Sequence, residues 1–457
     1  MKTLGIIAEF NPLHDGHSFF LREAKEAARA DYLIVVMSGD FVQRGAPAIC
    51  DKFSRAQMAL SEGADLVLEL PLYYALSSAE TFATGAVSVL NALGVVDTIA
   101  FGSEAGDLTA LETVASVLLS ETKAFQSALK AALKEGLSFP AAREKAFLAS
   151  APGLTKDIPA LLQEDPDLMK GANNILGIEY LKALKRTNSA MNPLTVKRAP
   201  QYASASQIRE TIFGDGTGSA SAVMRRRNLA LSQMPYACRA ILTQAAGENG
   251  AGLLTTNDFS QILQYKLAVS AMLPSVDIVD LSQDLWERIR FIYSSTPYQS
   301  FDEFTASLKS KNLTYTAIQR ALMHLLLDIN NTSMRRYTGA AADAGSESGS
   351  AAGAGSETGA DAGVNGRNTS AGYTVYIRAL GFKKDASPLL KAIKEHAALP
   401  LITKLADAEK QLADTPQGAD ALALLKEDIA ASRVFDVVRR RTEKTEYEKQ
   451  VVIIPSH

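Results

Sequence analysis

Apolar and polar positions in the first hundred residues follow two alternating patterns. Four continuous apolar runs predict buried strands, at residues 4–10, 31–39, 64–71 and 96–104. Three stretches between them repeat apolar side chains at helical spacing, at residues 17–30, 51–63 and 79–94. Strands that are apolar throughout and alternate with helices are typical of βαβ units, whose parallel sheet is buried on both faces. We therefore predict an α/β fold with a Rossmann-like parallel sheet.

Helical patterns dominate the rest of the chain. The expected elements are mostly helix at 105–170, a helix at 171–188, a short strand at 193–201 and a serine-capped helix at 204–214. Beyond about residue 220 strand signals nearly vanish, and Leu-, Ala- and Arg-rich helical periods take over. We therefore predict two domains that meet near residue 215, a sheet domain at 1–215 and a mostly helical domain at 216–457.

Residues 339–372 differ in composition from the segments around them. Gly, Ala, Ser, Thr, Asp, Glu and Asn make up almost the whole segment, which has no aromatic residue and one branched aliphatic residue, Val364. Such a segment buries too little apolar surface to offset the entropy lost on ordering. We predict a disordered insertion within the helical domain and assign it no chemistry.

Composition narrows the class of protein without determining its function. With 47% hydrophobic and 21% charged residues, the 457-residue chain has the composition of a soluble globular protein. Cys50 and Cys238 lie far apart and form neither a metal-binding spacing nor a disulfide framework, which fits a reducing compartment. The apolar run at 3–10 is too short for a signal peptide and contains Glu9, and no run approaches the ~20 residues of a membrane span. We expect a cytoplasmic protein that does not enter a membrane.

Each predicted strand of the first hundred residues ends in a polar or glycine-bearing loop. The four loops read NPLHDGH, SGDFVQRG, ELP and FGSE. Ligands of open parallel sheets bind outside the carboxyl ends of the strands, where these loops converge. Glycine and proline could also serve only to end the strands, an interpretation that suits ELP better than the first loop.

The first loop carries two of the five histidines of the chain, His14 and His17, at the start of a predicted helix. A helix N-terminus presents unpaired amides and a partial positive charge, which favour an anion. Gly16 has no Cβ, so a phosphate or nucleotide can approach the backbone. The two histidines lie one helical turn apart and can donate hydrogen bonds to a phosphoryl group in the transition state. The pair could instead ligate zinc or serve only to cap and pack the helix, although further zinc ligands are missing nearby apart from Glu9 and Asp15.

The HxGH pattern after a first strand resembles the signature of the HIGH nucleotidyltransferase superfamily, whose members attack the α-phosphate of ATP and release pyrophosphate. The chain contains no P-loop motif, so a P-loop does not hold the phosphates. A second segment, SASQIRETI, is similar to the serine-rich segment that holds the distal phosphates in nucleotidyltransferases. This resemblance places Ser204, Ser206 and Arg209 near the triphosphate, although the same residues could form an ordinary capped helix start.

Six segments in order along the chain resemble one bacterial family within this superfamily, the tRNA(Met) cytidine acetate ligases. They are AEFNPLHDGH, MSGDFVQRGAPA, DLVLELP, FGSEAGD, NNILGIEYLKAL and YTAIQRALMHLLL. The likeness runs from residue 1 to about 335 and resumes near 376–385, while the segment 339–372 departs from the family pattern. Members of the family use ATP to activate acetate as acetyl-adenylate and then acetylate N4 of the wobble cytidine of elongator tRNA(Met).

The resemblance implies an ATP-dependent carbon–nitrogen ligase of tRNA processing, with ATP as substrate, Mg²⁺ accompanying it, and acetate and elongator tRNA(Met) as partners. Residues 1–215 would form the ATP-binding catalytic domain, with His14 and His17 as catalytic residues, and residues 216–457 the RNA-binding domain. The residues implied to contact ATP are Ile7, Ala8, Glu9, Phe10, Asn11, Pro12, Leu13, His14, Asp15, Gly16, His17, Ser18, Phe19, Phe20, Gly102, Asn173 or Asn174, and Arg198. Asparagine at a helix start could hydrogen-bond a base or ribose edge, and arginine could pair with phosphate oxygens. Without the family match, these residues could also be a helix cap and a surface charge.

The formal net charge of −3 gives no global argument for nucleic-acid binding, so contacts with RNA need local patches. The candidate phosphate contacts are Arg225, Arg226, Arg227, Arg335, Arg336, Lys383, Lys384, Arg439, Arg440 and Arg441. A run of basic residues is also typical of a solvated helix face, so both interpretations of each patch stay open.

Two other functions remain open on the sequence. A small-molecule adenylyltransferase would share the nucleotidyltransferase core and transfer AMP from ATP to a phosphorylated cofactor precursor, but it would not need so large a helical half. A non-catalytic nucleotide-binding module could scaffold RNA, but it has no evident need for two histidines that stabilise a charged transition state. We therefore favour the RNA-modifying ligase.

Overall fold

The computed structural model describes residues 1–120, 122–137, 139–150, 165–214, 220–247, 250, 252–310, 313–338, 374–415, 417–441 and 444–455. The disordered insertion predicted at 339–372 lies outside these ranges. Within them, no helix is both long enough and apolar enough to cross a lipid bilayer.

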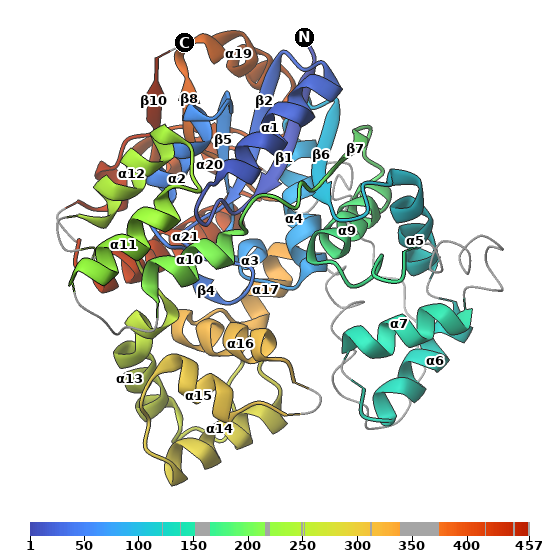
Figure 1. The fold of residues 1–457 in the computed structure, drawn as a ribbon, viewed down its shortest axis with the longest axis vertical. Coiled ribbons are helices and arrows are strands. Elements are labelled where there is room, and N and C mark those ends of the chain that lie inside the picture. The colour runs from blue at the N-terminus through green and yellow to red at the C-terminus, as the bar shows by residue number, and fades with distance from the viewer. Residues whose placement is uncertain are drawn as a thin grey trace.

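A mostly parallel sheet forms the centre of the molecule (Figure 1). Its strands lie in the order β10-β8-β5-β2-β1-β6-β7, with β9 beside β8. Their bounds are β1 (Thr3–Ala8), β2 (Tyr32–Ser38), β5 (Leu66–Leu70), β6 (Thr98–Ser103), β7 (Asn192–Lys197), β8 (Ile377–Lys383), β9 (Leu401–Ile402) and β10 (Val452–Ile454). All neighbours pair in parallel except β5 with β8. The predicted α/β fold is confirmed, and its strand order reverses between β1 and β6, where ligands of such sheets bind.

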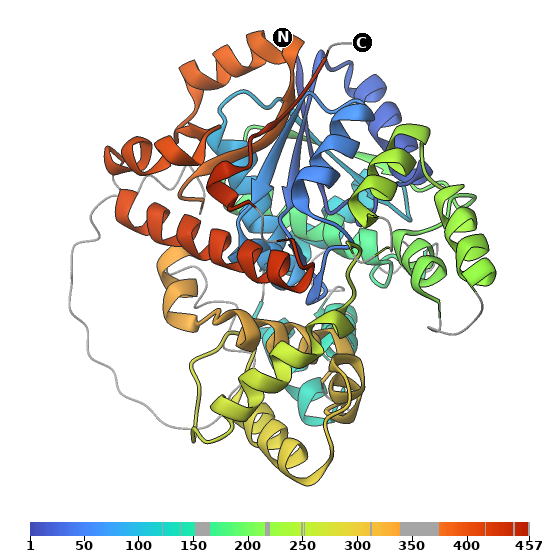
Figure 2. The same cartoon turned by 90° about the vertical axis from the view of Figure 1, so that its left-hand side faces the viewer.

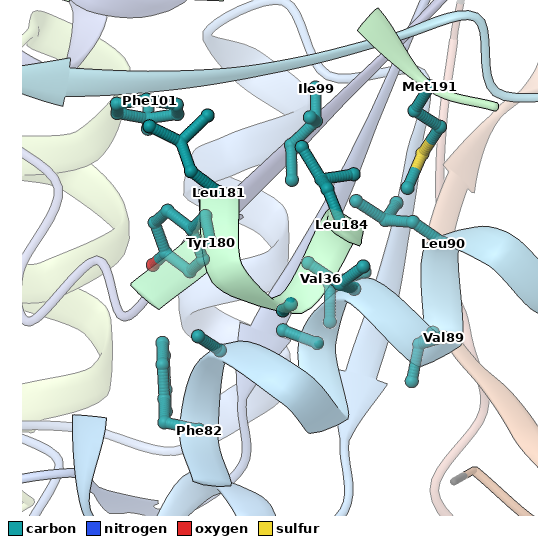
Figure 3. Close-up of a cluster of buried hydrophobic side chains, with 14 of the residues drawn as sticks. Val36, Phe82, Val89, Leu90, Ile99, Phe101, Tyr180, Leu181, Leu184 and Met191 are labelled. Atoms are coloured by element: carbon teal, nitrogen blue, oxygen red, sulfur yellow. The ribbon is translucent and has the colours of Figure 1, made fainter. Parts of the chain in front are cut away.

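Alternate residues of the central strands pack on opposite faces of the sheet. Ile34 and Val36 of β2 share a core with α4, α5 and α9, part of which Figure 3 shows around Val36. Leu33 and Val35 belong to the core on the other face, with α1, α2 and α12. Because successive side chains of a strand point to opposite faces, a strand buried on both sides must be apolar throughout. The helices around the sheet are α1 (Asp15–Ala28), α2 (Lys52–Ser61), α3 (Leu72–Ala75), α4 (Ala79–Ala92), α5 (Leu108–Ser120), α9 (Ala172–Arg186), α10 (Ala205–Phe213), α11 (Ala220–Leu231), α12 (Tyr236–Ala246) and α19 (Ser387–His396).

A second group of helices packs beyond the carboxyl ends of the strands (Figures 1 and 2), around a core that also includes Leu72 and Tyr73 of α3. Its members are η2 (Thr256–Phe259), α13 (Ser260–Ser270), α14 (Gln283–Ser295), α15 (Phe301–Ser307), α16 (Tyr315–Leu327) and α17 (Asn331–Thr338). His324 of α16 joins this group to the sheet unit. Its ring nitrogens lie 3.0 Å from the carbonyl oxygen of Val279 and 2.6 Å from that of Leu76, the residue after α3. Separately, α6 (Lys123–Lys134) packs against α7 (Phe139–Ser150).

Two parts of the predicted helical domain instead complete the sheet unit. In α12, Cys238 and Leu242 share a buried core with Met58 of α2. Farther on, β8 pairs with β5 in antiparallel direction and β10 pairs with β8, so the helical prediction was wrong for these two strands. Both strands pair with segments far away in the sequence, which local patterns do not record. A boundary near residue 215 therefore does not separate a sheet domain from a helical one.

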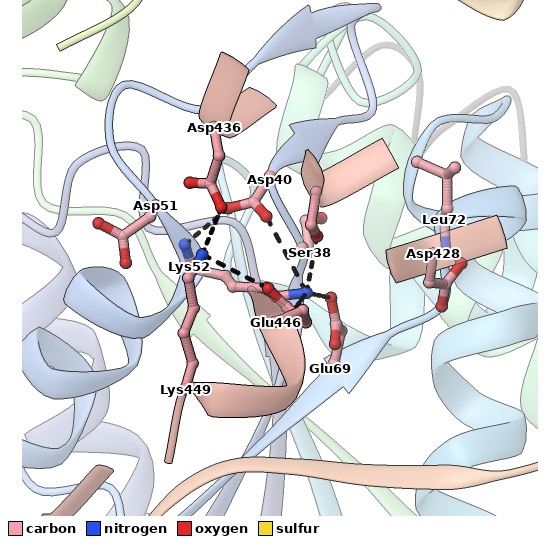
Figure 4. Close-up of polar contacts among 12 residues, drawn as sticks. Ser38, Asp40, Asp51, Lys52, Glu69, Leu72, Asp428, Asp436, Glu446 and Lys449 are labelled. Carbon is pink, nitrogen blue, oxygen red and sulfur yellow. Dashed lines mark hydrogen bonds and ion pairs between the residues drawn. The ribbon is translucent and has the colours of Figure 1, made fainter. Parts of the chain in front are cut away.

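A buried cluster of charges fastens the C-terminal segment to the sheet (Figure 4). Lys52, the first residue of α2, is fully buried, and its Nζ lies 2.7 Å from Glu69 of β5 and 2.6 Å from Glu446. Arg378 of β8 pairs with both carboxylates at 2.9 Å. Burial raises the pKa of Glu446, but Lys52 and Arg378 outweigh this effect and hold that pKa well below its ordinary value. These two cations and two carboxylates therefore balance one another and join elements from distant parts of the chain.

Asp428 of α21 (Gly418–Val438) is another buried carboxylate in this region. Its ionisation makes the free energy of unfolding depend on pH. It accepts hydrogen bonds from the Leu72 amide (3.0 Å) and from the Tyr376 hydroxyl. Burial, and next the charge of Glu69, raise its pKa to about 7. Folded Asp428 therefore keeps a proton that the unfolded chain loses above about pH 4. Folding takes up a proton in that interval, so stability falls as the pH rises from about 4 to 7.

Replacing Asp428 by asparagine, which carries no charge at any pH, should flatten this part of the stability profile. We expect the free energy of unfolding of the wild type to fall more steeply between about pH 5 and 7.5 than that of Asp428→Asn. Urea denaturation in matched buffers measures both slopes. Equal slopes would show that folded Asp428 is already ionised at the lower pH.

Candidate active site

The loop between β1 and α1 holds both predicted catalytic histidines. His14 is the N-cap of α1, and its Nδ1 accepts a hydrogen bond from the Gly16 amide (3.1 Å). The Nδ1 of His17 accepts one from the His14 amide (3.4 Å). The two rings stack with centroids 3.8 Å apart, and Phe10 lies edge-on to His17. A neutral imidazole whose Nδ1 is an acceptor carries its proton on Nε2, so each ring keeps one Nε2–H donor.

Burial and nearby arginines keep both rings neutral at neutral pH. Burial lowers the pKa of His14 to about 4, with smaller contributions from the charges of Arg198 and Arg209. Burial also lowers the pKa of His17 well below its ordinary value, and His14 and Arg198 add to this effect. Two arginines from distant parts of the chain thus act on the loop. Neutral hydrogen-bond donors backed by fixed positive charge are suited to binding an anion.

The two glycines of the predicted site have different surroundings. A Cβ at Gly16 would lie 3.0 Å from Cε1 of His14 and 3.1 Å from Cβ of Tyr202, so a side chain there would displace one of these neighbours. A Cβ at Gly102, in β6, would meet Cγ of Arg198 at 3.8 Å, which is an ordinary contact. Packing therefore explains the glycine at 16 but not the one at 102.

Asn173 and Asn174, at the start of α9, have different contacts. Asn174 is buried, and its Oδ1 accepts hydrogen bonds from the amides of Glu104 and Ala105. The Glu104 carboxylate accepts from the Asn174 amide (2.8 Å) and from the Asn173 side chain (2.7 Å). The same carboxylate lies 3.7 Å from Arg198. Sequence analysis missed Glu104 as a site residue, although it belongs to the polar FGSE loop that pointed to this edge of the sheet.

Glu104 remains ionised in spite of its position. Burial raises its pKa, but hydrogen bonds from Asn173 and Asn174 outweigh burial and lower the pKa overall. A fixed negative charge therefore stands beside Arg198. The arginine directly follows β7, next to the end of β6. Asn173, which is only half-buried, is the more accessible of the two asparagines.

The serine-rich segment begins α10, and its polar side chains contact the helix and the histidine loop. The Oγ of Ser204 accepts a hydrogen bond from the Gln207 amide (3.3 Å), which is the helix-cap alternative. Arg209 donates through Nη1 to the carbonyl of Asn11 (2.5 Å) and through Nη2 to Ser206 (3.1 Å). The structure thus brings Arg209 and Ser206 to the histidine loop, and their contact with a triphosphate stays a prediction.

Two of the predicted RNA-binding patches lie close together in the fold. A Cβ added to Gly250 would lie 3.7 Å from Nη1 of Arg227. A Cβ added to Gly247 would lie 2.9 Å from Nη2 of Arg441. Both glycines follow α12 within a few residues. Arg441, which follows α21, and Arg227 of α11 therefore meet near one turn, which the sequence alone does not indicate.

The other predicted RNA contacts differ in exposure. Those exposed are Arg225, Arg335, Arg336 and Arg440, whereas Arg226 is half-buried. Arg439 is only 7% exposed, and its Nη1 lies 2.8 Å from Asp51, the N-cap of α2. The structure contradicts the prediction for Arg439, because a buried guanidinium paired with Asp51 has no surface to offer a phosphate.

Known proteins match the sequence over most of the chain. The family model described as HIGH nucleotidyl transferase matches residues 1–344. The tRNA(Met) cytidine acetate ligase of Thermoanaerobacter sp. (strain X514) is 35% identical over 452 residues, which cover 97% of this chain and 96% of that protein. This chain belongs to the tRNA(Met) cytidine acetate ligase family. A protein of the same name from Caldanaerobacter subterraneus subsp. tengcongensis is 37% identical over 425 residues, 91% of this chain and 92% of its own.

A solved structure extends the family likeness to the fold. The crystal structure of Thermotoga maritima TmcAL bound with alpha-thio ATP superposes with a TM-score of 0.81 at 28% sequence identity. The match covers 100% of both chains. The predicted class, a HIGH nucleotidyltransferase fold within the tRNA(Met) cytidine acetate ligase family, is therefore confirmed.

Proposed function

We propose that this protein activates acetate with ATP as acetyl-adenylate and acetylates N4 of the wobble cytidine of elongator tRNA(Met). The observation that carries the proposal is the match to a ligase of this name over 97% of the chain. The HIGH nucleotidyl transferase model matches residues 1–344, which include the HxGH loop. A small-molecule adenylyltransferase would share only the nucleotidyltransferase part. We assign ATP binding and catalysis to residues within 1–215, and RNA binding chiefly to residues within 216–457. Because ATP and tRNA are substrates of the cytoplasm, we propose that location as well.

The first step joins acetate to AMP. An acetate oxygen attacks the α-phosphorus of ATP, the bond from that phosphorus to the bridging oxygen breaks, and pyrophosphate leaves. Negative charge develops on the phosphoryl oxygens. The Nε2–H groups of His14 and His17 and the first amides of α1 supply hydrogen-bond donors, and Arg198 and Arg209 supply positive charge.

The second step transfers the acetyl group to RNA. The N4 amine of the cytidine attacks the carbonyl carbon of acetyl-adenylate, the carbon–oxygen bond to AMP breaks, and N4 loses a proton. The products are N4-acetylcytidine and AMP.

We assign the ATP site to residues 7–20 with Gly102, Asn173 and Arg198. The arginines near the turn after α12 would hold tRNA phosphates.

We expect a magnesium ion to accompany ATP without a dedicated protein cage. In the part of the chain that the structure describes, no group of three or more His, Cys, Asp or Glu side chains could hold a metal ion. Phosphate oxygens and water are ligands that Mg²⁺ commonly keeps. The proposal therefore assigns no side chain of this protein to the ion.

Mass spectrometry of tRNA nucleosides tests the proposed function. An elongator tRNA(Met) transcript incubated with the protein, ATP and acetate should contain N4-acetylcytidine, and AMP and pyrophosphate should appear in equal amounts. A matched transcript with uridine at the wobble position is the control and should stay unmodified. No acetylcytidine in the first transcript would contradict the proposal, and AMP transfer to a small phosphorylated acceptor would favour the alternative.

Binding of tRNA should weaken steeply as salt is added, because phosphate contacts release counterions. The variant Arg225→Glu, Arg440→Glu reverses two exposed charges and should reduce the slope of log affinity against log salt by about 2. Lys391→Glu is the control, since Lys391 is exposed on α19 outside the patches. A salt titration of tRNA binding measures the slopes, and ATP binding should be unchanged throughout. Equal slopes for wild type and double variant would mean that these arginines are only solvated helix faces.

A further inference from the structure

Arg55 is a fully buried arginine of α2 whose guanidinium donates to four main-chain carbonyl groups. Its Nε donates to Cys50 (3.1 Å), and its Nη1 to Glu9 (2.7 Å). Nη1 also donates to Ser38 (3.0 Å), and Nη2 donates to Gly39. Glu9 directly follows β1, and residues 38 and 39 end β2. One side chain therefore ties together the carboxyl ends of the two central strands.

No carboxylate neutralises this cation at close range. Within the described ranges Arg55 forms no ion pair, whereas the buried arginines Arg378 and Arg439 each pair with a carboxylate. The charge of Asp40 acts on Arg55 over a longer distance, but burial raises the pKa of Asp40 and disfavours its ionised form. A buried charge without a counter-charge is unfavourable. A bound anion at the ends of β1 and β2 would supply that counter-charge.

The loop that Arg55 holds has an unfavourable backbone conformation. Phe10 follows Glu9 and has a φ of 46°, in the left-handed region that bulky side chains avoid. Hydrogen bonds also hold the two neighbours of Phe10. The Gln43 amide donates to the Glu9 carboxylate (2.9 Å), and the Ile49 amide donates to Oδ1 of Asn11 (2.7 Å). Such a conformation is retained only where the surroundings over-determine it, most often at functional sites.

We propose that Arg55 is a positioning residue for adenylation, which fixes the loop leading to His14 and His17 and places an unneutralised positive charge beside the substrate phosphates. This inference rests on the function proposed above. The loop begins at the Glu9 carbonyl that Arg55 holds and ends at the N-cap of α1. A displacement at Glu9 is therefore transmitted over a few residues to the two Nε2–H donors, where small shifts have large effects on rate.

Two substitutions separate the charge of Arg55 from its hydrogen bonds. Arg55→Lys keeps the charge but cannot reach four carbonyl groups, and Arg55→Met removes both. Arg378→Lys is the matched control, because Arg378 is also a buried arginine but its partners Glu69 and Glu446 lie outside the histidine loop. Circular dichroism and thermal unfolding establish which variants fold.

The first readout is the single-turnover rate of acetate-dependent acetyl-adenylate and pyrophosphate formation at saturating ATP without tRNA, with the ATP dissociation constant measured separately. We expect this rate to fall about 100-fold in Arg55→Met and about 10-fold in Arg55→Lys, and to stay within about threefold in Arg378→Lys. The ATP dissociation constant of Arg55→Lys should change less than its rate does. Rates of both Arg55 variants within about threefold of wild type would overturn the inference, as would a failure of Arg55→Lys to fold.

The second readout does not depend on catalysis. Nitrogen NMR of the imidazoles reports the hydrogen bonds at Nδ1 of His14 and His17, and Arg55→Lys should move these signals while Arg378→Lys leaves them in place. Unmoved signals in Arg55→Lys would also overturn the inference. If the wild type shows no acetate-dependent turnover, the proposed function fails, while the NMR comparison still decides whether Arg55 positions the loop.

Discussion

Replacing His14 or His17 by alanine should lower the rate of acetyl-adenylate formation by about 10²- to 10³-fold while the protein stays folded. Each substitution removes a neutral Nε2–H donor, which the capping hydrogen bonds of α1 hold in one tautomer. A preorganised donor to a developing oxyanion is typically worth ~3 kcal/mol. Pyrophosphate exchange measured without tRNA isolates this step from transfer to the RNA.

Loss of the helix cap must be separated from loss of the donor. His14 is an N-cap, and removing a cap lowers stability by ~1 kcal/mol. Ser78→Ala is the matched control, because Ser78 caps α4 by accepting a hydrogen bond from the Thr81 amide. This control should lose similar stability and keep its rate. Exchange near the wild-type rate in both folded histidine variants would show that these rings do not stabilise the transition state.

Lys52→Met should lower the free energy of unfolding by about 3–5 kcal/mol. Methionine occupies a similar volume, so the loss reflects charge more than packing. Glu69 and Glu446 would lose their ammonium partner while remaining only 4% and 5% exposed. Urea denaturation followed by circular dichroism measures the change.

Two further variants show whether the loss of stability in Lys52→Met comes from the burial of its partners. Lys145→Met breaks an exposed pair with Glu135 and should lower stability by less than about 1 kcal/mol. Adding Glu446→Gln to Lys52→Met should restore part of the loss, because it removes one of the two carboxylates left without the lysine. A loss below about 1 kcal/mol for Lys52→Met would mean that the remaining cations, Arg378 and Lys449, are sufficient for the two carboxylates.

Short-range patterns were enough to predict five strands of the sheet and the start of α1. Each of the four apolar runs in the first hundred residues contains a strand, β1, β2, β5 and β6, because a strand covered on both faces must be apolar throughout. The short run at 193–201 likewise contains β7. His14 and His17 could be placed together at a helix start because the capping interactions join residues within one turn of α1.

Roles that depend on partners far away in the chain became clear only in the folded protein. Arg439 looks like an exposed basic residue until the fold places it against Asp51, and Arg55 gives no sign in the sequence that it meets the carbonyl of Glu9. The strand β8 is likewise defined by β5, which belongs to the other end of the chain. Buried ion pairs and hydrogen bonds are determined by which segments meet on folding, and the local periodicity of a sequence carries no record of those meetings.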